Sequence, residues 1–473
     1  MKSGVIKKVL LIVLAYVLVC CLIPPMFHKS VAGANEEITL QEQGSSATED
    51  ASLATSPQER ILCIDDNTKA LEWRLSVIEE AEEELILSTF DFRDDNSGHD
   101  MIAALYHAAE RGVRIRILVD GFNVPIRMGN SRYFNALASH PNVEVKSYNP
   151  IRITKLWKVN YRLHDKYLIA DDTVYILGGR NTNDLFLGNY AEHYNIDRDI
   201  LVYDTAMSSD NTLHEVKDYF EEIWALDINK TWRTKDHSRY EQEEEELEEH
   251  YQSLKNSYPN AFAEVDWEEE TMAVDHISLI TNPIEAESKS PTLFALLCDY
   301  MAEGEDVLIQ TPYIVCGSDM YDSLTQLTQS GVQLSLVTNA VQVPNDNPWG
   351  LLDYENQKSN ILKTGMEVYE CMNEQLIHTK AVLIDDDICI LGSYNLDMRS
   401  TYLDTEMMLV IESEELNAYL RDLIAESQDK SIHVLPDGTE TLGPDYESVT
   451  LPIWKRIYYT AIRIIIIPFR SLV

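Results

Sequence analysis

One pattern of residues occurs twice in this chain and constrains its fold more than any other feature of the sequence. His164 is followed by a lysine after two residues, an aspartate after seven, a glycine after fourteen and an asparagine after seventeen, and His378 is followed by the same residue types at the same spacings. The two sets are His164, Lys166, Asp171, Gly178 and Asn181, and His378, Lys380, Asp385, Gly392 and Asn395. Such a repeat indicates an internal duplication, and hence two domains of one fold.

The segments before each motif follow one order of predicted helices and strands. Helices are expected over 68–83, 98–110, 291–302 and 320–329, and strands over 84–91, 113–120, 306–313 and 332–339. Gly112 and Gly331 stand between a helix and a strand, where glycine commonly ends a helix. The chain is therefore predicted to belong to the α/β class, with two similar α/β domains about a pseudo-twofold axis.

Changes in composition divide the chain into six segments. These are an N-terminal transmembrane anchor or signal peptide (1–30), a flexible linker (31–60), the first domain (61–235), an acidic linker (236–270), the second domain (271–430) and a C-terminal tail with a basic amphipathic segment (431–473). The acidic linker is expected to be a solvated surface segment without a function of its own.

The N-terminal segment combines positive charge with a long apolar run. Lys2, Lys7 and Lys8 precede an uncharged stretch over 9–27, long enough to span a bilayer as a slightly short helix. The positive flank should stay cytoplasmic, which would place the domains on the extracytoplasmic face of the cell membrane, held by a single span. A signal-peptidase site at 32–34 is the alternative. We favour the anchor because the run is longer than a typical signal h-region.

The tail has a charge balance opposite to that of the whole chain. The chain has 38 basic and 79 acidic residues, a net charge of −41, which argues against a nucleic-acid partner. Residues 450–473 instead contain four basic residues and no acid, interleaved with aromatic and aliphatic side chains. This composition suits a helix at a membrane interface. A helix docked on the protein's own core is the alternative.

The repeated residues can form a phosphodiester-cleaving site. Histidine and lysine two apart on a strand share one face, and returning strands over 174–177 and 388–391 would bring Asn181 and Asn395 beside them. Two such clusters at the duplication axis offer two imidazoles, two ammoniums and two carboxamides. One histidine could attack phosphorus and the other protonate the leaving alcohol, while lysine and asparagine hold the non-bridging oxygens.

These residues resemble the HxKxxxxD motif of the phospholipase D superfamily with its trailing GSxN element. Further stretches at 109–113, 311–313, 392–400 and 405–407 are similar to bacterial phospholipase D-type cardiolipin synthases, in the shorter variety with Gly-Gly-Arg-Asn in the first motif. The resemblance covers about residues 61–425. It implies two phospholipase D-like domains, a covalent phosphohistidine intermediate, and neither a cofactor nor a metal.

The resemblance also implies roles for single residues. It makes His164 the nucleophile and His378 the general acid and base, although the two could be exchanged. The implied catalytic set is His164, Lys166, Asp171, His378, Lys380 and Asp385. Within this set, Asp171 and Asp385 are expected to bond around the strand turn rather than to touch substrate.

Five more residues complete the expected site. Substrate binding is assigned to Asn181, Asn395 and Ser393. The carboxylates that orient the imidazoles should come from the strand after each motif, where Glu406 fits in the second half and Asp197 in the first, with Asp199 and Glu192 as rivals. The first motif has Gly179 where the second has Ser393, so only one hydroxyl is available near the phosphate.

A basic segment precedes the first motif. Residues 121–166 contain eight basic residues against two acids, interleaved with apolar side chains. The basic residues are Arg127, Arg132, Lys146, Arg152, Lys155, Lys158, Arg162 and Lys166. This patch suits an entrance for a lipid headgroup, with Leu156, Trp157 and Tyr161 as its apolar walls. A basic loop that merely offsets the acidic surface is the alternative.

The expected activity is transfer of a phosphatidyl group from one phospholipid to the alcohol of another, giving cardiolipin. The expected partners are phospholipid substrates and the membrane. Hydrolysis, with water as the acceptor, is the first alternative. A nuclease is disfavoured by the charge and the anchor, and a catalytically silent membrane-tethered module by the intact motifs.

Overall fold

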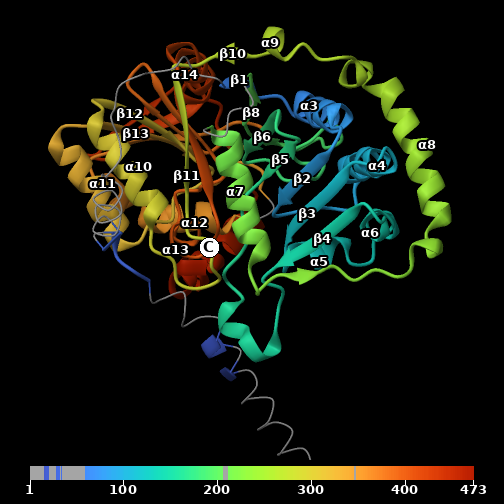
Figure 1. Ribbon diagram of the computed structural model, residues 1–473. Coiled ribbons are helices and arrows are strands. Elements are labelled where there is room, and N and C mark those ends of the chain that lie inside the picture. The colour runs from blue at the N-terminus through green and yellow to red at the C-terminus, as the bar shows by residue number, and fades with distance from the viewer. Residues whose placement is uncertain are drawn as a thin grey trace, which may run out of the picture.

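A computed structural model describes residues 15–16, 18–20, 28–31, 33–34, 59–205, 211–345 and 348–472. It shows two α/β halves side by side, each built on a nine-stranded sheet (Figure 1). Most of the expected anchor (1–30) and linker (31–60) lies outside the described residues. Among the residues described, no helix is both long and apolar enough to cross a membrane.

The first sheet has the strand order β10-β1-β8-β6-β5-β2-β3-β4-β9. Its strands are β1 (Glu59–Ile64), β2 (Glu84–Thr89), β3 (Arg114–Asp120), β4 (Val143–Tyr148), β5 (Tyr167–Ala170), β6 (Val174–Gly178), β8 (Asp199–Asp204), β9 (Lys230–Thr231) and β10 (Met272–Ala273). The helices of this half are α3 (Asn67–Glu80), α4 (Asn96–Glu110), α5 (Asn123–Met128), α6 (Arg132–Ser139), η2 (Ile153–Lys158), α7 (Thr212–Ala225) and α8 (Glu241–Ser257).

The second sheet has the order β11-β18-β17-β16-β12-β13-β14-β19-β20. Its strands are β11 (His276–Thr281), β12 (Asp306–Gln310), β13 (Gln333–Asn339), β14 (Glu367–Cys371), β16 (Ala381–Ile384), β17 (Ile388–Gly392), β18 (Met407–Glu412), β19 (Ser431–Val434) and β20 (Glu440–Leu442). Its helices are α10 (Thr292–Glu303), α11 (Ser318–Ser330), α12 (Trp349–Lys363), α13 (Met398–Tyr402), α14 (Glu414–Asp429), α15 (Ile453–Ile466) and the closing η5 (Ile467–Leu472).

The two sheets repeat one topology. In the first, β2, β3 and β4 are parallel and the hairpin β5–β6 pairs antiparallel to β2; in the second, β12, β13, β14 and the hairpin β16–β17 do the same. The central strands are buried on both faces, as expected for parallel strands covered by helices. Gly112 and Gly331 have φ of 100° and 113°, the left-handed conformation expected where a glycine ends a helix. The predicted duplication is confirmed.

Short backbone contacts join the two halves at their centre. β7 (Asn195–Ile196) and β15 (Leu376–Ile377) form a parallel pair, and Leu163 forms a parallel bridge to Thr405. One apolar core cluster contains residues of both halves, such as Val202 and Leu409. The halves therefore share their interior around the duplication axis.

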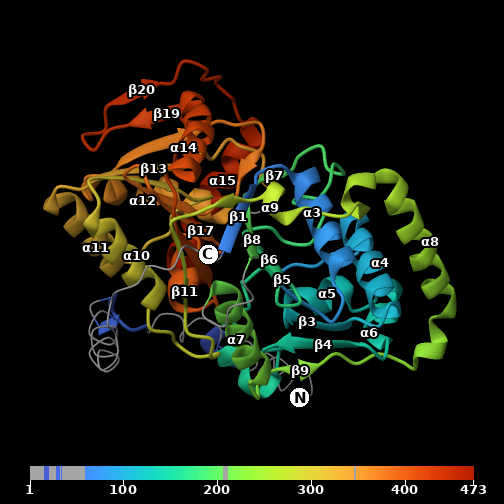
Figure 2. The ribbon, with the colours of Figure 1, turned by 45° about the horizontal axis from the view of Figure 1, so that its top comes forward.

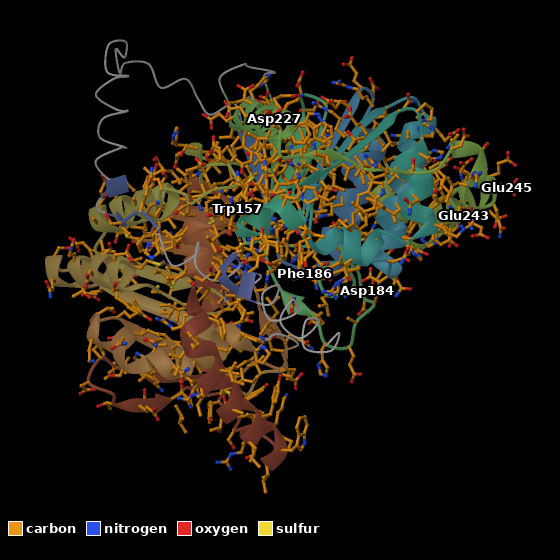
Figure 3. All side chains as sticks on the ribbon, turned by 90° about the horizontal axis from the view of Figure 1, so that it is seen from below. Trp157, Asp184, Phe186, Asp227, Glu243 and Glu245 are labelled. Carbon is orange, nitrogen blue, oxygen red and sulfur yellow. The ribbon has the colours of Figure 1, made fainter. Side chains whose placement is uncertain are left out.

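Two segments outside the predicted domains form regular structure. The acidic linker contains α8, which runs along α4 and α6 at the outer edge of the first half (Figures 1 and 2). Leu247 and Tyr251 of this helix are buried, while Glu245 is exposed at the periphery (Figure 3). The first part of the expected tail adds β19 and β20 to the second sheet, because β14 offers a free edge.

Candidate active site

The two motif histidines meet in one cavity between the halves. His164 lies just before β5, and His378 lies between β15 and β16. Both line a cavity of about 330 Å³ together with Asn181 and Asn395. The rings of Phe90 and Phe186 meet the imidazoles of His164 and His378 edge to face, at centroid distances of 5.0 and 4.8 Å. The structure thus brings the histidines and asparagines of both motifs to one site.

The carboxylates that hold the histidines are exchanged between the halves. His164 Nδ1 lies 2.8 Å from Glu406 Oε1, and His378 Nδ1 lies 2.6 Å from Asp197 Oδ2. The inter-half contacts explain this exchange, because the bridge between Leu163 and Thr405 and the pairing of β15 with β7 place each histidine beside the carboxylate of the other half. With Nδ1 engaged, Nε2 of each ring is the nitrogen that can meet a substrate, and Nε2 of His378 also lies 3.3 Å from Lys380 Nζ.

The rivals of Asp197 have other surroundings. Asp199 is buried beside two guanidinium groups, at 2.8 Å from Arg74 and 3.3 Å from Arg180. Glu192 is exposed on the loop before β7. Asp197 is therefore the carboxylate of the first half that contacts a motif histidine.

The two carboxylates differ in their electrostatics. Burial raises the pKa of Glu406 to about 7, and the nearby Lys166 only partly offsets it. Burial also opposes ionisation of Asp197, but Lys380 and His378 outweigh it and hold the pKa of Asp197 well below its usual range. Asp197 is therefore ionised throughout the neutral range, whereas Glu406 titrates within it.

Burial shifts the pKa values of the imidazoles and ammoniums of the site toward their neutral forms. Burial, with Lys166 nearby, lowers the pKa of His164 well below its usual value, and burial with Lys380 lowers that of His378 to about 3. Burial lowers the pKa of Lys166 to about 8 and of Lys380 to about 7. A bound phosphate would favour the charged forms of these groups, so the site suits an anion.

The motif aspartates lie away from this cavity. Asp171 and Asp385 stand at the turns of the hairpins β5–β6 and β16–β17, with φ of 51° and 46°. Asp171 accepts hydrogen bonds from the amides of Glu82, Glu83 and Glu84 (2.7–2.9 Å), and Asp385 accepts equivalent bonds before β12. These carboxylates fasten each hairpin to its neighbouring strand, as expected, and do not touch the histidines.

Ser393 has a different place from the asparagines. It is fully buried, its hydroxyl donates to Glu406 Oε2, and it accepts from the Met407 amide at 3.1 Å. The Ser393 hydroxyl therefore positions the carboxylate that holds His164, and Ser393 does not line the cavity. Asn181 and Asn395 do line the cavity, and the carboxamide of Asn395 lies 3.5 Å from the Tyr313 hydroxyl.

A steric cause explains why the first motif has Gly179 where the second has Ser393. A Cβ atom at this position would lie 2.5 Å from Asp197 Oδ2 and 2.6 Å from Oδ1. The side chain of Asp197 therefore lies close to the backbone at Gly179. In the second half, Ser393 occupies the equivalent position and the carboxylate belongs to the longer Glu406. Glycine is thus required for Asp197 to reach His378.

We expect Gly179→Ser to reduce turnover by displacing Asp197 from His378, with little effect on His164. The fall in kcat should approach that of a variant that lacks the Asp197 carboxylate. Losses of general acid–base catalysis of this kind are about 10²-fold or more. A thermal melt is measured beside kcat to check the fold. Gly438→Ser, on an exposed turn far from the site where φ of 84° also disfavours a side chain, is the control for a strained glycine substitution. Unchanged kcat in Gly179→Ser would show that Asp197 tolerates the displacement.

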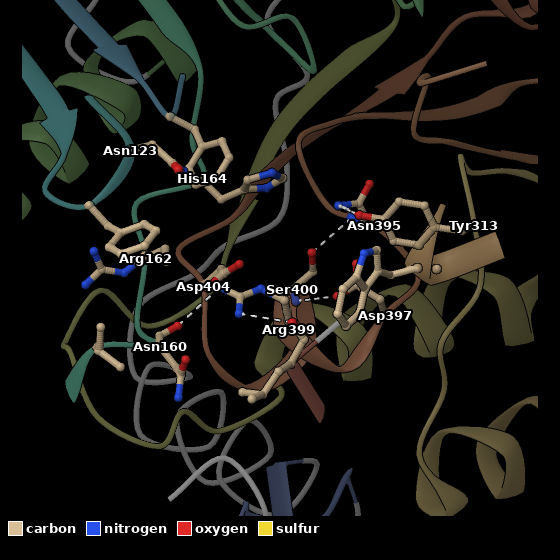
Figure 4. A pocket seen from close by; sticks show the side chains of 16 residues that line it. Asn123, Asn160, Arg162, His164, Tyr313, Asn395, Asp397, Arg399, Ser400 and Asp404 are labelled. Atoms are coloured by element: carbon tan, nitrogen blue, oxygen red, sulfur yellow. Dashed lines mark hydrogen bonds and ion pairs between the residues drawn. The ribbon is translucent and has the colours of Figure 1, made fainter. Parts of the chain in front are cut away.

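A second, larger cavity meets the first at His164. It measures about 520 Å³ and shares Phe90, His164, Tyr313 and Asn395 with the smaller one (Figure 4). Its other lining residues include Phe122, Asn123, Val159, Asn160, Arg162, Trp349, Arg399, Asp404 and Leu472. Two cavities that reach one histidine from different sides can hold two substrates.

Sequence reasoning assigned no role to several of these residues. Phe90 and Tyr313 follow β2 and β12, the strands that flank the motif hairpins, and ligand sites of α/β sheets lie beyond such strand ends. That position is the signal that could have found them. Arg399 and Leu472 had no comparable signal, because only the folded chain brings them together.

The basic segment is only partly at the site. Arg162 lines the larger cavity and Trp157 is exposed nearby on η2, but Tyr161 is buried in the core. Arg132 pairs instead with Glu243 of α8, so that part of the positive charge offsets the acidic helix. No group of three or more histidine, cysteine or acidic side chains within the described ranges is arranged to hold a metal ion.

Comparison with known proteins agrees with this geometry. The family model described as "Cardiolipin synthase, PLD-like domain" matches residues 75–224 and 297–427. Cardiolipin synthase C of Escherichia coli (strain K12) is 28% identical over 400 residues, 75% of this chain and 82% of that protein. Cardiolipin synthase of Oceanobacillus iheyensis is 26% identical over 355 residues, 72% and 63% of the two chains. The crystal structure of phosphatidylserine synthase from Haemophilus influenzae Rd KW20 superposes with a TM-score of 0.59 at 14% identity, covering 92% of this chain and all of that one.

A duplicated fold with two exchanged histidine–carboxylate pairs at one cavity defines an enzyme of the phospholipase D type. The match over both halves shows more: the chain belongs to the cardiolipin synthase, PLD-like domain family. It is a phosphatidyltransferase of that type.

Proposed function

We propose that this enzyme makes cardiolipin, by moving a phosphatidyl group from one phospholipid to the hydroxyl of another through a phosphohistidine intermediate. The observation that carries the proposal is the pair of cavities that meet at His164. A hydrolase needs room for one lipid and water, whereas a lipid–lipid transferase needs room for two lipids. The names of the relatives support the same reaction.

The proposed first step uses Nε2 of both rings. His164, neutral at pH 7, attacks phosphorus, and the bond from phosphorus to the leaving oxygen breaks as His378 gives that oxygen a proton. His378 must enter this step as the imidazolium, a form that the negative charge of the bound phosphodiester and of the ionised Asp197 both favour. Lys166, Lys380 and the two asparagines would hold the non-bridging oxygens, where charge develops.

The proposed second step reverses the first with a new alcohol. The acceptor hydroxyl gives its proton to His378, its oxygen attacks phosphorus, and the bond from phosphorus to His164 breaks. Any alcohol or water could resolve the intermediate, so transfer needs the acceptor held nearby and water kept scarce. Phe90 and Tyr313, which wall both cavities, and Phe122 and Trp349 supply apolar surface for that purpose.

The products of the purified chain test this proposal directly. Incubated with phosphatidylglycerol vesicles, with and without phosphatidylethanolamine, the enzyme should form cardiolipin in excess of phosphatidic acid. The variants His164→Ala and His378→Ala serve as blanks. Release of phosphatidic acid and free alcohol alone would contradict the transferase and support the hydrolase.

Activity is expected to survive EDTA. Lys166 and Lys380 would supply the positive charge that Mg²⁺ supplies in other phosphoryl-transfer sites. Initial rates of cardiolipin formation, measured before and after dialysis against chelator, should agree. Loss of activity that a divalent ion restored would contradict this mechanism.

The proposal places the enzyme at the cell membrane, with its domains on the extracytoplasmic face. The apolar run over 9–27 and its preceding lysines support an anchor. Deleting residues 1–30 should weaken attachment to membranes in a sedimentation assay, and further deletion of 450–473 should weaken it more. A double truncation that still pelleted fully would contradict both assignments.

A further inference from the structure

Three exposed segments surround the larger cavity and share one character. Phe122 and Asn123, at the start of α5, line the cavity, and Ile126 of that helix is 66% exposed. Val159 and Asn160 line it directly after η2, where Ile153 is 80% exposed. Apolar side chains are thus left in water beside a site that handles lipids.

The C-terminal helix is the third segment. One side of α15 docks on α12, where Tyr459 and Ile466 are buried against Leu352. The opposite side is apolar and exposed, through Ile453, Trp454, Ile457, Tyr458, Ile464 and Ile465. The tail helix therefore docks on the protein with one side and presents an exposed apolar face with the other.

The chain end after α15 is fastened into the cavity wall. Arg470 Nε donates to both carboxylate oxygens of the buried Asp353, at 2.8 and 2.9 Å, and Nη2 of the same side chain donates to the Cys316 carbonyl. Leu472, two residues later, lines the larger cavity. The chain end that follows α15 therefore forms part of the wall of the larger cavity.

One guanidinium joins two of these segments. Arg399 donates to the carbonyl of Asn160 at 3.3 Å and to that of Leu472 at 3.5 Å, and it pairs with Asp404 at 3.0 Å. The end of η2 and the end of the chain therefore lie side by side at the mouth of the cavity. We call the exposed apolar and basic side chains of α5, η2 and α15 the rim surface; Trp157 of η2 appears on the side seen in Figure 3.

The N-terminal part of the chain reaches the same place. Tyr16, within the apolar run, donates its hydroxyl to the Ile153 carbonyl at 3.3 Å. His28, at the end of that run, stacks on Tyr402 of α13 at a centroid distance of 3.9 Å. The segment expected to enter the bilayer thus contacts the rim surface.

The charge of the rim surface selects its partner. Lys155 and Lys158 lie on η2, and Lys455 and Arg456 on α15, in a chain whose net charge is −41. A second copy of such an acidic chain would be repelled over most of its surface, whereas an anionic bilayer is attracted to basic and aromatic side chains flanking an apolar face. Trp454 and Tyr458 are residue types favoured at the level of lipid headgroups.

We propose that the rim surface docks on an anionic phospholipid bilayer, so that a lipid passes from the bilayer into the larger cavity and reaches His164 without crossing bulk water. The inference rests on the proposed phosphatidyl transfer. It adds the route by which one substrate enters, and it gives α15 a role in activity beyond attachment. Water would be displaced from the mouth of the cavity on docking, which favours transfer over hydrolysis.

The test compares vesicle-borne with monomeric substrate in the full-length chain. Because the N-terminal apolar run is itself expected to bind membranes, activity is the readout rather than pelleting. Ile153→Glu and Ile464→Glu, singly and together, place charge on the rim surface away from the catalytic groups. Leu442→Glu, on β20 and 65% exposed, is the matched control.

With phosphatidylglycerol vesicles the double variant should lose about tenfold or more of its activity, because carboxylates oppose insertion into an anionic interface. With short-chain phosphatidylglycerol below its micellar concentration, it should keep activity within about twofold of the parent. Equal loss on both substrates, or loss on neither, would overturn the proposal. So would a lipid-free dimer of the parent that these substitutions dissociate. A parent chain that made no cardiolipin from either substrate would instead contradict the proposed function.

Discussion

Replacing either His164 or His378 by alanine is expected to abolish phosphatidyl transfer while leaving the fold intact. Each imidazole performs a covalent or proton-transfer step that no neighbour can take over, so kcat should fall by at least about 10⁴-fold. His433→Ala is a matched control. His433 lies on β19 and pairs with Glu367 of β14, outside both cavities. Cardiolipin formation and a thermal melt of each variant provide the measurement.

The same variants distinguish the roles of the two rings. With a phosphatidyl donor that has a good leaving group, such as p-nitrophenol, His164 can attack without an acid. His378→Ala should then accumulate phosphatidyl label on the protein, because no base remains to activate the acceptor, whereas His164→Ala should remain unlabelled. Label on the His164→Ala chain would exchange the two assignments. Substantial turnover by either variant would rule out a shared site.

The exchanged carboxylates lead to a second large effect, and the two should differ in their pH dependence. Asp197→Asn removes a charge that is present throughout the neutral range, so kcat should fall by about 10²- to 10⁴-fold at every pH from 6 to 8. Glu406 has a pKa of about 7, so at pH 6 its side chain is mostly protonated and neutral. The neutral amide of Glu406→Gln therefore resembles the parent side chain at that pH. At pH 8 the parent carries a carboxylate that glutamine lacks. The defect of Glu406→Gln should therefore grow as the pH rises.

Profiles of kcat against pH for the parent and both variants test this difference. Asp199→Asn, whose carboxylate pairs with Arg74 rather than a histidine, is the control for loss of a buried charge in the same strand region. Such a loss should lower the melting temperature more than it changes the shape of the pH profile. Parallel profiles for Asp197→Asn and Glu406→Gln would contradict the electrostatic difference between the two pairs.

The sequence predicted the architecture well because the duplication left a strong signal. The spacing from His164 to Asn181 recurs after His378, and the alternation of apolar strands and amphipathic helices recurs with it. These patterns depend only on local periodicity and on turns such as those at Gly112 and Gly331. The α/β class and the two-domain order followed from them.

The exchange of partners could not be predicted in this way. Nothing local in the sequence indicates that Glu406 holds His164 or that Asp197 holds His378, because the pairing depends on how the halves meet. The contacts of Ser393 were missed for a related reason. A hydroxyl beside a phosphate motif suggests substrate binding, but Glu406 competes for it in the folded chain.

The larger cavity could not be predicted from the sequence either. Its wall combines Asn160, Arg399 and Leu472, which lie far apart in the sequence and belong to segments expected to have separate roles. Composition indicated that the tail was basic and apolar, but only the ion pair between Arg470 and Asp353 shows that its end closes a cavity. Long-range contacts of this kind leave no periodic trace in a sequence.

The exchange of partners also restricts how such an enzyme could have arisen. Neither half holds a complete histidine–carboxylate pair, since His164 depends on Glu406 and His378 on Asp197. An ancestor with a single half would have worked only by joining a second copy of itself, each copy lending its carboxylate to the other. After fusion, one half could specialise only while it continued to serve its neighbour.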